Sequence, residues 1–165
     1  MTAADSRPPL TLTVADLTVR FVWCDDRWVH EVVQADGTCW RSIEGSAGAA
    51  GDPRWPPSPV LVELSWLGTS PGPAILGVGL AGRSHFSASV GPDPDHRDRL
   101  RFDIACRVNE PPGWLGSTYR GPQGVVRVAP GPVAARPPTT VQWGYWFTPT
   151  GILSLAGAQA EPPAD

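Results

Sequence analysis

The sequence predicts a single all-β domain, an antiparallel β-barrel or β-sandwich of about 8–11 short strands with long loops rich in proline and glycine. Three observations support this fold class. Short segments rich in valine, isoleucine, threonine and aromatic residues alternate with proline–glycine clusters. No stretch shows a sustained helical period of apolar residues. The 20 prolines and 18 glycines are about twice the usual share, and they separate the apolar segments without forming a repeat.

The chain of 165 residues is long enough for one domain with its own core. We expect a flexible tail at 1–9, a β domain at 10–156 and a second flexible tail at 157–165, because both ends are rich in proline, alanine and acidic residues. The strand signature recurs eleven times between the tails. The expected strands are 10–15, 17–24, 27–35, 38–44, 60–67, 74–80, 84–90, 99–108, 124–128, 139–147 and 152–155. The only helical structure that we expect is one short turn near 46–51.

The first strands are expected to pair as consecutive hairpins. Asp36-Gly37 is typical of a two-residue type I′ turn between 27–35 and 38–44, and Asp25-Asp26 is a weaker signal for the turn before it. This register places Arg20 opposite Glu31, a favourable pair. It also predicts an apolar core face, made of Leu17, Val19, Phe21, Trp23, Trp28, His30, Val32, Cys39, Arg41 and Ile43.

The second half of the chain shows the same alternation. Segments 84–90 and 99–108 are expected to form a hairpin around the loop 91–98, with Phe86, Ala88, Val90, Phe102, Ile104, Cys106 and Val108 facing inward. In 139–147, one face carries Val141, Trp143, Tyr145 and Phe147. Trp146 lies on the opposite face, which indicates burial on both sides or an interface.

Composition excludes several function classes. The net charge of −3 without a basic block argues against nucleic-acid binding. No apolar run has the length of a membrane span, and the first residues do not resemble a secretory signal, so we expect a cytoplasmic protein without membrane contact. All 13 basic residues are arginines, which excludes chemistry that requires a lysine Schiff base or a phosphate-loop lysine.

The sequence predicts neither a metal site nor a cofactor. The three cysteines and the three histidines lack metal-ligand spacing, and the acidic loop 91–98 combines two prolines with a competing arginine. The segment 77–82 matches G-x-G-x-x-G, but a strand-like segment follows it instead of the helix that binds a pyrophosphate. These glycines indicate a bend or bulge.

Catalytic residues are not assigned from the sequence. Ser84 or Ser87 together with His85 and Asp103 would provide the groups of a hydrolytic triad on neighbouring strands. No G-x-S-x-G elbow and no oxyanion donor accompany them. A hydrolase-type enzyme that uses His85 and Asp103 is therefore kept as the second alternative function.

The excess of tryptophan, eight residues in all, carries the leading functional hypothesis. Most of these rings are expected in the core. Trp55, in the loop 45–59, and Trp114, in the loop 110–124, are the exceptions, together with Trp146. Exposed aromatic rings mark ligand clefts or partner surfaces; in the competing interpretation, both loops fold back and their rings cover a sheet or a barrel end. The candidate binding residues are Trp114, Tyr119, Arg120, Arg107, Trp55 and Trp146, with an arginine meeting an anion.

The leading hypothesis is a non-enzymatic domain that binds a small apolar or aromatic ligand, or a protein partner, through these aromatic residues. The first alternative is a structural or interaction protein that forms a homodimer through the aromatic strand 139–147.

Overall fold

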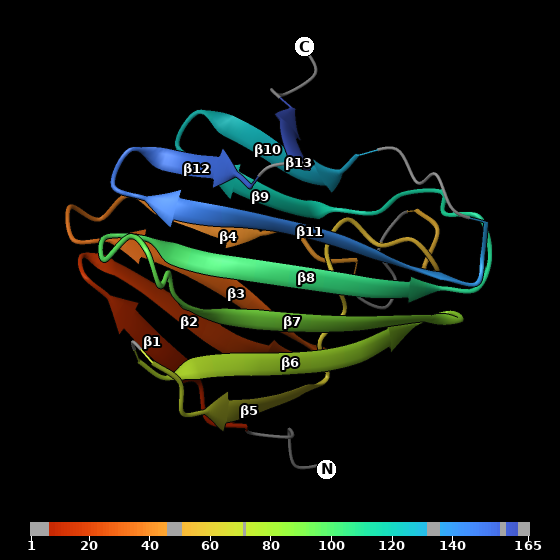
Figure 1. Ribbon diagram of the computed structural model, residues 1–165, viewed down its shortest axis with the longest axis horizontal. Coiled ribbons are helices and arrows are strands. Elements are labelled where there is room, and N and C mark those ends of the chain that lie inside the picture. Colours follow the sequence, from red (N-terminus) through yellow and green to blue (C-terminus); the bar gives the residue numbers. More distant parts are fainter. Residues whose placement is uncertain (1–6, 46–50, 71, 132–135, 156–157, 162–165) are drawn as a thin grey trace.

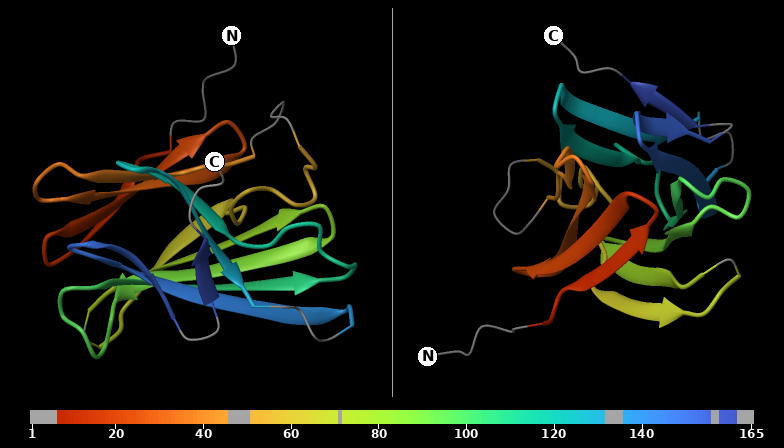
Figure 2. Two further views of the ribbon diagram at one scale, coloured as in Figure 1. Left: turned by 90° about the horizontal axis from the view of Figure 1, so that it is seen from above. Right: turned by 90° about the vertical axis from the view of Figure 1, so that its left-hand side faces the viewer.

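The computed structural model describes residues 7–45, 51–70, 72–131, 136–155 and 158–161, the last four by their backbone alone. Two antiparallel sheets pack face to face, as the two views of Figure 2 show. Of the two architectures that the sequence left open, the protein adopts the β-sandwich. The long strands of one sheet lie in front in Figure 1, and the other sheet lies behind them.

The two sheets differ in their strand order. Sheet A contains, in spatial order, β1 (Leu10–Val14), β2 (Leu17–Cys24), β3 (Arg27–Gln34), β4 (Cys39–Ser42), β9 (Ser117–Gly121), β10 (Gly124–Pro130) and β13 (Ala158–Glu161). Sheet B contains β12 (Gly151–Ser154), β11 (Thr139–Thr148), β8 (Leu100–Val108), β7 (Ser84–Pro92), β6 (Ala74–Ala81) and β5 (Glu63–Leu67). Sheet A therefore joins β4 to β9, strands that are far apart in the chain.

Two of the thirteen strands in the described part of the chain were not expected from the sequence. Strand β9 has the sequence STYRG, whose flanking prolines and glycines are typical of a loop, yet it lies between β4 and β10. Strand β13 lies within the predicted tail 157–165 and pairs with β10. The expected turn near 46–51 falls mostly outside the described residues. Within the described ranges, no helix has the length and apolarity needed to cross a membrane.

The first hairpin follows the predicted register. Cys24 pairs with Arg27 across a two-residue turn, and Arg20 lies opposite Glu31. The turn holds Asp25 at a positive φ of 56°, a conformation that aspartate tolerates better than most residues. The prediction for β2 and β3 is therefore confirmed.

The second hairpin differs from the prediction by one residue. Its closing hydrogen bond joins the backbone N–H of Gln34 to the carbonyl of Thr38, so the loop contains three residues and ends on Gly37 at φ 91°. Val32 consequently lies opposite Trp40. The one-residue shift exchanges the faces of β4, so Trp40 is buried in the core and Arg41 faces solvent.

Sheet B follows the predicted alternation. The inward positions of β7 and β8 are buried, and the two strands form the expected hairpin. In β11, Val141, Trp143, Tyr145 and Phe147 are buried as predicted. Of the glycines in the 77–82 motif, Gly77 and Gly79 lie within β6, and Gly82 (φ 55°) lies in the turn that leads to β7. A side chain at Gly79 would collide with the backbone carbonyl of Val60, so this glycine permits a close approach of two chain segments.

Aromatic rings from both sheets fill the centre of the sandwich. Tyr119, Tyr145, Phe102 and Phe147 are fully buried, and neighbouring ring centroids among them lie 5.1–6.0 Å apart. A chain of hydrogen bonds crosses between the sheets: His30 Nε2 lies 2.7 Å from Tyr119 Oη, which lies 2.6 Å from Tyr145 Oη. Burial lowers the pKa of His30 to about 3, so this histidine is neutral at physiological pH.

Candidate functional site

Two loops bring their tryptophans to one hollow on the outer face of sheet A. Trp55 belongs to the segment between β4 and β5, and Trp114 to the segment between β8 and β9. The hollow has a volume of about 380 Å³, within the range of small-molecule sites. We call it the tryptophan groove; its lining residues are Ile43, Trp55, Pro57, Trp114, Thr118, Val125 and Arg127.

Hydrogen bonds fix the loops onto β9. The carbonyl oxygen of Pro57 accepts bonds from Trp114 Nε1 at 3.2 Å and from Thr118 Oγ1 at 2.7 Å. The buried Ser58 hydroxyl accepts a bond from the backbone N–H of Thr118 and donates one to its carbonyl. The wall formed by Trp114 is therefore held by the same carbonyl that anchors the neighbouring loop, and the groove is preformed.

Two glycines beside Trp114 allow this packing. A Cβ atom at Gly113 would lie 2.9 Å from the Trp55 ring, and one at Gly116 would lie 2.7 Å from both the Trp114 ring and the carbonyl of Val128. Both tryptophan rings thus lie directly against backbone that lacks side chains. Trp55 is only 9% exposed, so it forms a wall, whereas Trp114 is half-buried and keeps part of its surface open to solvent.

Arginines border the groove on the same face of the sheet. Arg127 lines it, and Arg120 lies directly across from Val125, another lining residue. Arg41 is opposite Arg120 in the ladder between β4 and β9, a pairing of like charges that is unfavourable by itself. Arg41 pairs with Glu31 at 3.3 Å, but neither Arg120 nor Arg127 forms an ion pair with another described side chain. This edge of the groove therefore carries positive charge that an anion would neutralise.

The other predicted site residues lie elsewhere. Tyr119 points from β9 into the core, where it contacts His30 and Tyr145. Arg107 is exposed on β8, on the outer face of sheet B. Trp146 is half-buried on β11 and contacts the loop between β7 and β8. Of the six candidate residues, the structure brings Trp55 and Trp114 together and places Arg120 at their edge.

Sequence reasoning missed Arg127, Val125, Thr118, Ile43 and Pro57. Strand β9 was not expected, so its outward residues were not separated from the inward ones. Once β9 pairs with β4 and β10, simple alternation places Thr118 and Arg127 opposite each other and on the outside.

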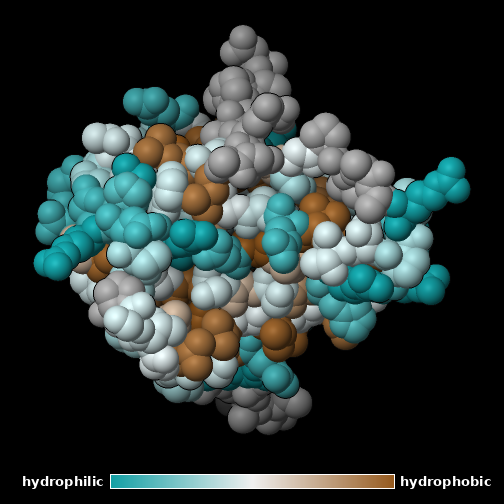
Figure 3. Space-filling view, viewed as in Figure 1, coloured by the Kyte–Doolittle hydropathy of each residue, from teal (hydrophilic) through white to brown (hydrophobic). Residues whose placement is uncertain are grey.

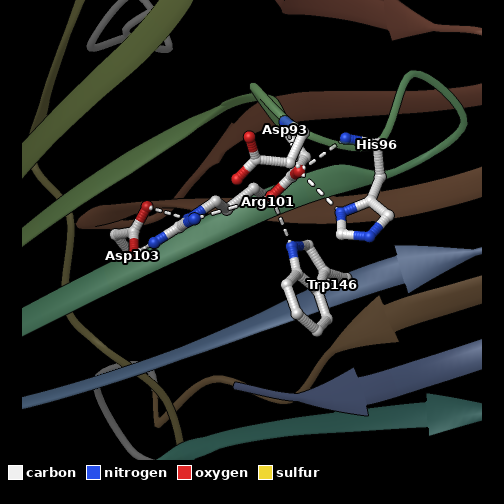
Figure 4. A network of polar contacts seen from close by, with 6 residues as sticks. Asp93, His96, Arg101, Asp103 and Trp146 are labelled. Carbon is white, nitrogen blue, oxygen red and sulfur yellow. Dashed lines mark hydrogen bonds and ion pairs between the residues drawn. The ribbon is translucent and has the colours of Figure 1, made fainter. Parts of the chain in front are cut away.

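A second polar cluster surrounds Asp93, which is 2% exposed (Figure 4). Its carboxylate accepts hydrogen bonds from Trp146 Nε1 at 2.6 Å, His96 Nδ1 at 2.9 Å and the backbone N–H groups of Asp95 and His96. Arg101 Nη1 lies 3.5 Å from it. Burial alone would raise the pKa of Asp93, but the hydrogen bonds outweigh it and lower the pKa to about 2. These bonds occupy the carboxylate, so we assign the cluster to holding the β7–β8 loop.

The alternative of a hydrolytic triad receives no geometric support. His85 lies opposite Arg107 in the ladder between β7 and β8, whereas Asp103 lies opposite Ser89. These two rungs are four residue steps apart along the strand, which corresponds to about 14 Å at roughly 3.4 Å per residue. Ser84 is buried on the inner face of the same sheet.

A buried acid lies behind the groove, on the inner side of sheet A. Burial raises the pKa of Glu44 to about 7, against smaller lowering effects of the Ser42 hydroxyl and the charge of Arg27. Among the buried polar atoms that have no hydrogen-bond partner within the described part of the chain, three belong to the first half of β3 and one to Glu44: Arg27 Nη1, Trp28 Nε1, His30 Nδ1 and Glu44 Oε2. Unpaired buried groups of this kind lower the free energy of unfolding, so we expect a substitution of Glu44 to change the stability of the protein.

Comparisons of the chain with protein-family models, with curated proteins and with solved structures found no match.

Proposed function

We propose that the protein is a binding protein for a small molecule that combines an aromatic or apolar body with one anionic group. The body would lie in the tryptophan groove against Trp114, Trp55 and Val125, and the anion would meet Arg127, which lines the groove. The observation that carries the proposal is the convergence of two loop tryptophans and Arg127 on one preformed hollow of about 380 Å³.

The chemistry of the lining supports this ligand class. Aromatic rings provide a large contact area at a low cost in side-chain entropy, since they have few rotatable bonds. A guanidinium group recognises a carboxylate, sulfonate or phosphate through paired N–H donors. The groove is open to solvent, so we expect the charge to contribute about 1.4 kcal/mol, which corresponds to a tenfold difference in affinity.

Isothermal titration calorimetry with naphthalene-2-carboxylate and its neutral amide tests both parts of the proposal. The acid should bind about tenfold more tightly than the amide. R127Q should remove this preference and leave the amide affinity unchanged, whereas W114A should weaken both compounds.

Two matched variants control for nonspecific effects. R20Q removes an exposed arginine from sheet A at a position three strands away from β9, and W66A removes an exposed tryptophan from β5. Both should bind like the wild type. Equal affinity for the acid and the amide, or unchanged binding by W114A, would contradict the proposal, and so would the absence of binding at millimolar ligand.

A further inference from the structure

The outer face of sheet B carries a pattern that is symmetric about one row of residues. The ladders align β6, β7, β8 and β11 so that outward side chains form three rows across the sheet. The central row is Val78, Ser87, Ala105 and Gln142. One flanking row is Leu76, Ser89, Asp103 and Gly144, and the other is Leu80, His85, Arg107 and Thr140.

This face is apolar along β6 and shallow at its centre. Val78 and Leu80 are 48% and 55% exposed, a large fraction for aliphatic side chains. Two hollows of about 590 and 530 Å³ adjoin there and share the small residues Ser87 and Ala105 as their floor. Figure 3 shows this face, with hydrophobic side chains gathered below its middle and hydrophilic ones toward its left and right ends.

The charges at the two flanking rows are opposite. Asp103 lies on one side of Ala105 and Arg107 on the other, both pointing outward from β8. The Asp103 side chain is 49% exposed, although it also pairs with Arg101 at 2.8 Å. Arg107 is exposed and has no ion pair among the residues that the structure describes. A surface with the opposite order of charges would therefore complement this face.

We propose that the partner is a second copy of this chain, packed face to face about a two-fold axis that runs along the central row. Such an axis reverses the direction of each strand, so Asp103 meets the partner's Arg107 and Arg107 meets the partner's Asp103. By the same operation Leu76 meets the partner's Leu80, and the small residues of the central row meet their own copies. The face is complementary to itself, as an isologous interface requires.

One residue of the central row opposes the contact. Glu63 lies on β5, opposite Val78, so it meets its own copy across the axis. Twisted sheets that pack face to face diverge toward their edges, which limits this repulsion. We therefore expect a dimer that weakens with added salt and that E63Q strengthens.

Sedimentation equilibrium of the full chain between about 5 and 200 μM, in low salt and in 0.5 M NaCl, measures the association. Dimer formation in low salt is expected. D103R and R107D should each raise the dimer dissociation constant at least tenfold, because each places like charges across both symmetric contacts. R20D makes the same charge change as R107D on sheet A and should associate like the wild type.

The most stringent test is whether exchanging the two charges restores dimer formation. The double variant D103R/R107D should dimerise like the wild type, because its charges are exchanged at both positions. An equimolar mixture of D103R and R107D should form a heterodimer, although each variant alone is monomeric. Circular dichroism and thermal melts show whether each variant is folded. A wild type that stays monomeric at 200 μM, or a dimer that the single variants leave intact, would overturn the proposal, and so would a mixture that does not associate.

Discussion

Asp93→Asn is expected to destabilise the protein by an amount that can be worked out from the surroundings of the carboxylate. The native pKa of Asp93 is about 2, against an ordinary value of 3.8. At 1.36 kcal/mol for each pH unit, this difference corresponds to about 2.4 kcal/mol of stability at pH 7. An asparagine retains one acceptor oxygen but directs N–H groups toward donors of Trp146, His96 or the backbone, so D93N should lose about 2 kcal/mol.

The pH dependence gives the sign of the effect. Because the native pKa of Asp93 is lowered, its contribution is complete above about pH 5 and is lost as the pH falls toward 2. The difference in unfolding free energy between wild type and D93N should therefore shrink to a few tenths of a kcal/mol at pH 2. Effects of other titrating groups are shared by both proteins and cancel in this difference.

Urea denaturation at pH 7, 4 and 2 measures these values. D95N is the matched control, since Asp95 is exposed and contributes only its backbone N–H to the cluster. D95N should unfold like the wild type. If D93N were as stable as D95N at pH 7, or if its deficit stayed constant down to pH 2, the assignment of Asp93 as the anchor of the loop would be refuted.

Three further predictions concern the core and the groove. Y119F leaves His30 Nε2 and Tyr145 Oη without their shared partner, so the free energy of unfolding should fall by about 1–3 kcal/mol in urea denaturation. Glu44 has a raised pKa of about 7, so its charge costs stability as the pH rises above 4.5; E44Q should melt at a higher temperature than the wild type at pH 8, and the two should melt together at pH 4. G116A should displace the Trp114 ring and weaken the binding of naphthalene-2-carboxylate, as measured by calorimetry. G151A, at an open turn, is the control and should leave binding unchanged.

Local patterning was sufficient to predict much of the sandwich. The alternation of apolar and polar residues identified the β7–β8 hairpin of sheet B and the pairing of β2 with β3, since two-residue periodicity and short turns are local properties. The turn after β3 shows the limit of this reasoning. Asp36-Gly37 is compatible with a two-residue or a three-residue loop, and the choice of one over the other moved Trp40 from the predicted outer face into the core.

The groove depends on non-local pairing, which the sequence does not display. Trp55 and Trp114 were recognised as unusual because they lie in loops rich in proline. Arg127 was not, because its relation to Trp114 requires β10 to pair with β9, and β9 to pair with β4 across nearly half of the chain. Strand β9 is short and flanked by glycine and proline, so its local signal is that of a loop.

The central claim is most directly tested by the NMR spectrum of the eight tryptophan indole N–H groups during titration with naphthalene-2-carboxylate. Substitution of single tryptophans by phenylalanine assigns the resonances. We expect the signals of Trp55 and Trp114 to shift in a saturable way with one common dissociation constant, while those of Trp66 and Trp146 stay in place. Unmoved signals of Trp55 and Trp114, or equal shifts at all exposed tryptophans, would contradict a ligand site in the groove.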